Sequence, residues 1–235
     1  MIKFFRKIRQ KMLTENKFSK YLIYAIGEII LVIIGILIAL GINENVKDRN
    51  NLELRDLYII QLNDEANRNL KQLNDFKNST LERTKEIDTL IQLLVNKDYD
   101  NPKLSSKSLI LIGTEEFYPI MITYENLKFS GDLKLFDDLN LRNSISELYE
   151  TFNEIKTVES IDKKGVQSYY ENFLIPNVSF WDMNTNSKSY AKETYFQNMA
   201  LARRVTLLQN RDAYEKSIES LTKLKITFSE LLNDN

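Results

Sequence analysis

The sequence predicts an all-α protein in which a single N-terminal transmembrane helix is followed by a periplasmic bundle of long amphipathic helices. Three observations predict this class. A nearly uncharged apolar run occupies residues 21–42. Only 6 glycines and 3 prolines occur in 235 residues, whereas folds rich in short strands need many more turn residues. In the remaining chain, apolar residues recur at steps of three and four, which is the spacing of one helix face.

The apolar run reads YLIYAIGEIILVIIGILIALGI, and Glu28 is its only formal charge. A helix rises about 1.5 Å per residue, so this length just crosses a hydrocarbon core of ~30 Å. We therefore expect three parts: a basic cytoplasmic or interfacial segment at 1–20, a transmembrane helix at 21–43, and a periplasmic helical domain at 44–235.

The charges that flank the run predict its orientation. Only Glu15 opposes the basic residues before the run, which are Lys3, Arg6, Lys7, Arg9, Lys11, Lys17 and Lys20. Positive flanks remain cytoplasmic, so we expect a single-pass protein with its N-terminus inside and its C-terminal domain in the periplasm. The basic segment is either an amphipathic helix on the inner leaflet or an unstructured flank. Because the apolar run exceeds the roughly 7–15 residues of a signal-peptide core, we expect an uncleaved anchor.

One face of the predicted span combines its acid with small residues. A wheel of 100° per residue places Ala25, Glu28, Val32, Gly35 and Ala39 together. Small residues four apart let two helix backbones approach closely, and acids inside a membrane usually face a partner or water. We expect this face to contact a second copy or a partner transmembrane helix. Two alternatives remain open: Glu28 reaches the cytoplasmic headgroups, or it is an ion-coupling carboxylate.

Four further helices are predicted after the span. The region from 43 to 96 contains neither glycine nor proline and predicts one long helix, or two end to end, which may continue out of the span. A short helix over 124–130 would be capped by Thr123 and closed by Gly131. A long helix begins at Asp137 or Asp138 and extends to Pro176; its stripe is Leu141, Ile145, Leu148, Phe152, Ile155 and, less regularly, Val158 and Ile161. The last helix runs from about Tyr190 to Leu232.

The composition excludes several kinds of chemistry. The chain has no cysteine and no histidine, which removes disulfides, thiol catalysis, the usual zinc sites and the commonest general base. Its net charge of −1 argues against nucleic-acid binding. Adjacent carboxylates such as Asp64/Glu65 and Glu115/Glu116 do not face each other on a helix, so we assign them to solvated faces. No catalytic, cofactor or metal site and no small-molecule substrate is identified, and we expect a protein that is not an enzyme.

Aromatic residues gather at the end of the second long helix and in the loop after it. They are Tyr169, Tyr170, Phe173, Phe180 and Trp181. Such a group can line a ligand pocket, but packing at a helix–loop junction is the favoured interpretation.

Two stretches, KFFRKIRQKMLTENKFSKYLIYAIGEIILVIIGILIALGIN and TYENLKFSGDLKLFDDLNLRNSISELY, resemble an uncharacterised family of single-span inner-membrane proteins from Bacteroidota, chiefly flavobacteria. Typical members read GEIxLVxxGILIALxIN in the span and TYxxLKSSGxLxLI beyond it. The matching residues beyond the span are Thr123, Tyr124, Leu127, Lys128, Ser130 and Gly131, whereas Phe129 replaces the usual serine. The resemblance implies placement in the inner membrane of a Gram-negative envelope, and it implies no activity.

These observations favour a membrane-anchored interaction or scaffold protein in an envelope complex. Its expected partners are the lipid bilayer and a second copy or a partner transmembrane helix. A sensory or ligand-binding bundle that signals through the span is the main alternative, and an ion-coupled accessory subunit that uses Glu28 is a further one. The segment at 1–20 is too short to be an output domain, so a sensor would need a partner to relay its signal.

Overall fold

The computed structural model describes residues 18–177 and 188–233. All regular structure within these two ranges is helical, which confirms the all-α class. The chain divides into two compact units, an N-terminal unit at Met1–Arg55 and a C-terminal unit at Asp56–Asn235. The predictions for the basic leader before residue 18 and for Phe180 and Trp181 lie outside the described residues.

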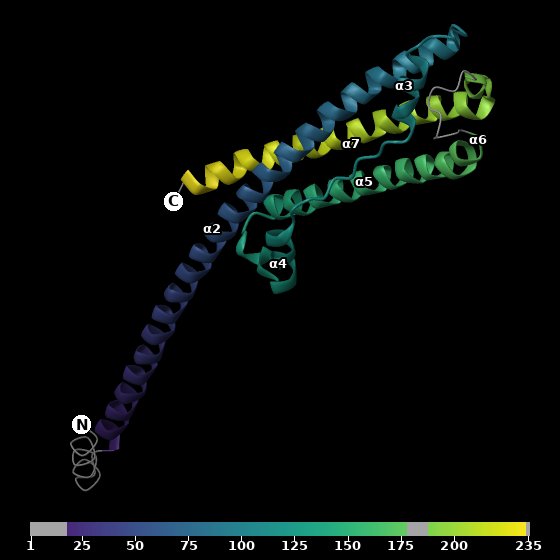
Figure 1. Cartoon of the computed structure of the whole chain (residues 1–235). Helices are drawn as coiled ribbons and strands as arrows, with labels where there is room; N and C mark the ends of the chain where they lie inside the picture. Colours follow the sequence, from purple (N-terminus) through teal and green to yellow (C-terminus); the bar gives the residue numbers. More distant parts are fainter. Residues whose placement is uncertain (1–17, 178–187, 234–235) are drawn as a thin grey trace. The chain divides into compact units, whose positions relative to one another are not determined.

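The first described helix, α2, spans Phe18–Val95 without interruption (Figure 1). Of the two possibilities left open by the sequence, a single helix continuing out of the apolar run is therefore the one observed. The boundary between the two units falls inside this helix. The helix ends where Lys97 adopts a left-handed conformation with φ of 54°.

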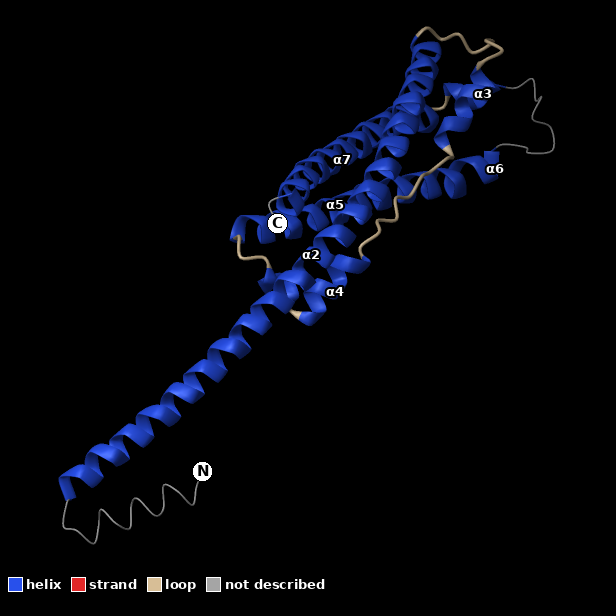
Figure 2. Cartoon of the chain, turned by 90° about the vertical axis from the view of Figure 1, so that its left-hand side faces the viewer, coloured by secondary structure: helices blue, strands red, loops and turns tan. Residues whose placement is uncertain are grey.

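The C-terminal unit is built on three long helices that lie side by side: α2 beyond Arg55, α5 (Leu139–Tyr169) and α7 (Thr194–Asn233). Figures 1 and 2 show that α2 and α5 run in the same direction and that α7 runs in the opposite direction. Buried positions alternate at steps of three and four, as in a coiled-coil seam. On α7 these positions are Phe196, Ala200, Arg203, Leu207, Asn210, Tyr214, Ser217, Leu221, Leu224 and Phe228.

The stripe expected on α5 is wrong in its second half. Glu159 and Asp162 are only 4% and 3% exposed, whereas Ile161 is 54% exposed and Val158 is half-buried. The steps of three and four that begin at Leu141 lead to the two acids and pass by both apolar residues. The position of a residue in the three-and-four spacing, rather than its hydrophobicity, therefore determines whether it is buried here. The two buried acids are stabilised by partners from other segments.

Beyond Tyr169 the helical path continues through a π-helical turn, η3 (Tyr170–Leu174), into α6 (Ile175–Asn177). The expected extension of this helix to Pro176 is confirmed. The last helix is preceded by a 3₁₀ segment, η4 (Lys188–Lys192), so α7 begins later than the predicted Tyr190.

The segment between α2 and α5 contains short helices joined by an irregular stretch. It begins with α3 (Leu104–Ser108) and η1 (Leu109–Leu111), and it ends with α4 (Ile122–Ser130) and η2 (Asp132–Leu135). Between η1 and α4, residues 113–121 have no regular secondary structure. We call residues 113–121 the strap, because in Figures 1 and 2 they run along the bundle.

Two of the predicted helix ends are confirmed and one is wrong. Gly131 closes α4 with φ of +73°, a region that glycine enters at little cost, and the Asp138 side chain accepts a hydrogen bond from the backbone N–H of Asn140 at the start of α5. Thr123 does not cap α4. It lies inside the helix after the capping position of Met121, and its hydroxyl donates to Glu65 instead.

Candidate functional site

Most residues of the predicted membrane face are exposed to solvent. Glu28, Gly35 and Ala39 are exposed, Val32 is 56% exposed and Ala25 is half-buried. The helix that holds them is the one helix among the described residues long and apolar enough to cross a membrane. Its most apolar 18-residue window has a mean hydropathy of 2.8, and none of that window is buried.

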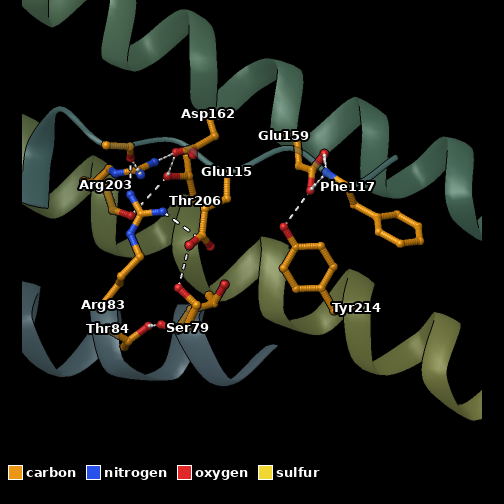
Figure 3. A network of polar contacts seen from close by, with 12 residues as sticks. Ser79, Arg83, Thr84, Glu115, Phe117, Glu159, Asp162, Arg203, Thr206 and Tyr214 are labelled. Atoms are coloured by element: carbon orange, nitrogen blue, oxygen red, sulfur yellow. Dashed lines mark hydrogen bonds and ion pairs between the residues drawn. The ribbon is translucent and has the colours of Figure 1, made fainter. Parts of the chain in front are cut away.

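In the C-terminal unit, buried polar side chains from all three long helices converge on the strap (Figure 3). A strap without regular structure cannot pair its own backbone N–H and C=O groups, so other groups must satisfy them. No backbone–backbone hydrogen bond joins strap residues to one another among the described residues. Side chains supply the partners instead, at three places along the strap.

The first place is the carbonyl of Gly113. Arg83 from α2 and Arg203 from α7 both donate to this oxygen. Arg203 is 1% exposed and forms a buried ion pair with Asp162 of α5, whose carboxylate also accepts from the Thr206 hydroxyl at 2.6 Å. Burial lowers the pKa of Arg203 to about 9, so the guanidinium remains charged at neutral pH. Residues from α2 and α7 thus meet at one carbonyl of the strap, and α5 is linked to it through the Arg203–Asp162 pair.

Glu115 extends this network along the strap. Its carboxylate accepts from the Ser79 hydroxyl at 2.5 Å and pairs with Arg83 at 3.6 Å. Two guanidinium groups, Arg83 and Arg203, are therefore balanced by two carboxylates, Glu115 and Asp162. The charges of this set balance, which is one condition under which buried charges are tolerated, whereas the buried Nε of Arg203 has no hydrogen-bond partner in the described part of the chain.

The second place is the backbone N–H of Phe117, which donates to both oxygens of Glu159 at 3.0 and 3.1 Å. The Tyr214 hydroxyl of α7 donates to the same carboxylate at 2.6 Å. Desolvation raises the pKa of Glu159 above 4.5, and Tyr214 also has a raised pKa for the same reason. Since the folded pKa of this acid exceeds its unfolded value, its contribution to stability is complete below pH 4.5 and is lost as the pH rises through the folded pKa.

The third place is Ile120, whose N–H and C=O both pair with the side-chain amide of Asn69 at 2.8 Å. Just beyond the strap, Glu65 accepts from the N–H and the hydroxyl of Thr123 at 2.7 and 2.8 Å. Glu65 is 5% exposed, so its assignment to a solvated face was wrong; its neighbour Asp64 is exposed as expected. The backbone of this segment requires acceptors, and that requirement accounts for the buried carboxylate.

The motif residues between Thr123 and Gly131 lie on α4 or at its end, and some of them attach α4 to the bundle. Thr123 binds Glu65, and Leu127 is fully buried. The ring of Tyr124 stacks on Tyr149 of α5 at 3.7 Å. Lys128 and Ser130 are exposed, and Gly131 closes the helix. Their buried members therefore dock α4 onto the bundle.

A cavity of about 440 Å³ lies between the strap and α5. Its strap side is formed by Glu116, Phe117, Tyr118, Pro119 and Met121. Its α5 side is formed by Phe152, Asn153, Lys156, Glu159, Ser160 and Lys163. Ligand sites are commonly concave, partly apolar and of this size, so this cavity is the candidate binding site of the C-terminal unit.

Two of the three described members of the predicted aromatic group lie in the core. Tyr169 and Phe173 are 1% and 5% exposed, and Phe196 and Tyr195 of α7 pack against them. Tyr170 lies outside this cluster with 44% exposure. Core packing at this junction is therefore confirmed for the two buried rings.

Sequence reasoning missed the charged residues of the network, Arg83, Glu159, Asp162 and Arg203. The signal that could have found them is their place in the alternation of three and four, where a charged residue occupies a core position.

Within residues 18–177 and 188–233, no group of three or more histidine, cysteine, aspartate or glutamate residues is placed to hold a metal ion. No family model matches the chain, nor does any curated protein or solved structure.

Proposed function

We propose that this protein is a membrane-anchored interaction protein of the inner membrane, whose helical C-terminal unit lies in the periplasm and whose span associates with a second copy or a partner helix. The observation that carries the proposal is the wholly exposed apolar window of α2, with a mean hydropathy of 2.8. Such a surface is unfavourable in water, and a bilayer together with a neighbouring helix would cover it.

The face with Glu28, Gly35 and Ala39 is the proposed helix contact. An acid in a bilayer is costly unless it has a polar partner, and the small residues permit close approach of a second backbone. The opposite face, with Ile30 and Leu37, would contact lipid.

The test compares two variants of the full chain after extraction in mild detergent. Glu28→Ala/Gly35→Leu/Ala39→Leu alters the proposed contact, and Ile30→Ala/Leu37→Ala alters the opposite face as a matched control. Light scattering should show that wild type and control are oligomeric or retain a specific partner, whereas the triple variant is monomeric. Three identical, partner-free monomers would refute the proposal.

The absence of cysteine from the sequence makes the orientation simple to test. Ser168→Cys places a thiol on an exposed position of α5, and Gln10→Cys places one in the basic leader. A membrane-impermeant maleimide added to intact spheroplasts should label the first and not the second. The reverse pattern would refute a periplasmic C-terminal unit.

A second candidate function, ligand binding by the C-terminal unit, is favoured by the cavity beside the strap. A ligand that binds there would raise the melting temperature of the folded protein. A pure scaffold would show no such shift with any small molecule.

A further inference from the structure

The cavity between the strap and α5 has one wall of hydrogen-bond donors. Asn153, Lys156, Ser160 and Lys163 follow one another at steps of three, four and three residues along α5, so they share one helix face. All four side chains carry hydrogen-bond donors, and the Lys163 ammonium is paired with Glu116.

The rest of the lining is largely apolar. Phe117 and Phe152 are buried with 5% and 3% exposure, and their rings lie edge to face at 5.5 Å. Pro119 and Met121 complete this side of the cavity. A compact apolar group would contact Pro119, Met121 and the small exposed part of the two rings.

The cavity lining holds two glutamates and two lysines, and three of these four charged groups have hydrogen-bond or ion-pair partners. Lys163 pairs with Glu116, which also accepts from the Tyr118 hydroxyl at 2.5 Å. Glu159 accepts hydrogen bonds from the Phe117 N–H and the Tyr214 hydroxyl, so its oxygens already have donors. Lys156 forms no ion pair with any residue in the described ranges. The remaining ammonium therefore gives the cavity a preference for an anion.

We propose that this cavity binds a small organic anion with a compact apolar body. The anionic group lies against Lys156 and Ser160, and the body packs on Phe117 and Phe152. This inference rests on the second candidate function, ligand binding by the C-terminal unit, and it is independent of association through the span.

The experiment uses three probes with the full-length protein in detergent, measured by titration calorimetry against a blank of empty micelles. 2-Naphthoate carries both features, 2-naphthamide has the apolar body alone, and acetate has the charge alone. We expect naphthoate to bind, naphthamide to bind more weakly, and acetate to show no measurable binding. Decanoate carries the same carboxylate on a flexible chain, so tighter binding of decanoate than of naphthoate would identify an acyl carboxylate as the ligand.

Three variants locate the site. Lys156→Gln should weaken naphthoate binding about tenfold, the effect of losing one charge-assisted hydrogen bond, and should leave naphthamide unchanged. Ser160→Phe, which fills the cavity from an exposed position, should abolish binding of both. Lys164→Gln removes a charge from the next residue outside the cavity lining and should change neither.

The outcomes separate the site from its ligand class. If naphthoate and naphthamide bind equally and Lys156→Gln has no effect, the preference for an anion is wrong although the cavity binds ligands. If neither naphthoate nor decanoate binds, or if Ser160→Phe leaves their binding intact, the assignment of this cavity as a binding site is wrong.

Discussion

The buried ion pair between Arg203 and Asp162 allows the sharpest test of the strap network. Arg203→Met keeps most of the side-chain volume and removes the guanidinium. Asp162, which is 3% exposed, would then keep the hydrogen bond from the Thr206 hydroxyl at 2.6 Å but lose its ion pair. Removing one partner of a buried pair typically costs about 3–5 kcal/mol, because the other charge remains buried without compensation.

The neighbouring residue provides the matched control. Arg204 pairs with Asp88 at 2.6 Å, but each side chain is 42% exposed, and exposed pairs contribute up to about 1 kcal/mol. The double variant Arg203→Met/Asp162→Leu removes both buried charges, and Gly113 keeps the donor from Arg83. We expect this variant to recover most of the loss.

The assay is thermal unfolding of the full chain in detergent, followed by circular dichroism at 222 nm. For a unit of this size, 1 kcal/mol shifts the melting temperature by about 2–4 °C, so Arg203→Met should lower it by about 10 °C. Arg204→Met should lower it by about 3 °C or less. If the two single variants melt together, or if the double variant is less stable than Arg203→Met, the reasoning about the buried pair is refuted.

Four further variants test the strap, one helix end and one position inside a helix. Glu159→Gln removes the carboxyl group with the raised pKa. Chemical denaturation should show that the free energy of unfolding falls less between pH 4.5 and 7 in this variant than in the wild type. Parallel pH profiles of the two proteins would contradict this. Asn69→Ala leaves the backbone N–H and C=O of Ile120 without their partner and should lower the free energy of unfolding by about 1–3 kcal/mol in chemical denaturation. A loss below about 0.5 kcal/mol would show that water replaces the amide. Gly131→Ala should destabilise the protein by about 1 kcal/mol, because φ at this position is +73°. Gly165→Ala, at an open site within α5, should stabilise it by about 0.5–1 kcal/mol. A change of stability in the same direction in both variants would count against the backbone argument.

Helix existence was predictable because it depends on local pattern. The absence of glycine and proline between residues 43 and 96 predicts a helix without interruption, as α2 is, and Asp138 and Gly131 mark helix ends through their own backbone preferences. Thr123 shows the limit of this approach. A threonine that fits a cap also fits a buried hydrogen bond to Glu65, and that acceptor lies 58 residues away in the chain.

The sequence by itself therefore determined the helical class, the apolar segment long enough to span a membrane, and most of the apolar core positions. Only the tertiary structure decided which partners stabilise the buried polar residues, because the partners of Arg203, Asp162 and Glu159 come from other helices and from the strap. A charged residue is stable in the core when such partners contact it. The spacing of residues along one helix does not identify these partners, because they come from other segments. The cavity beside Lys156 follows from the same cause, since its two walls come from segments brought together by the fold.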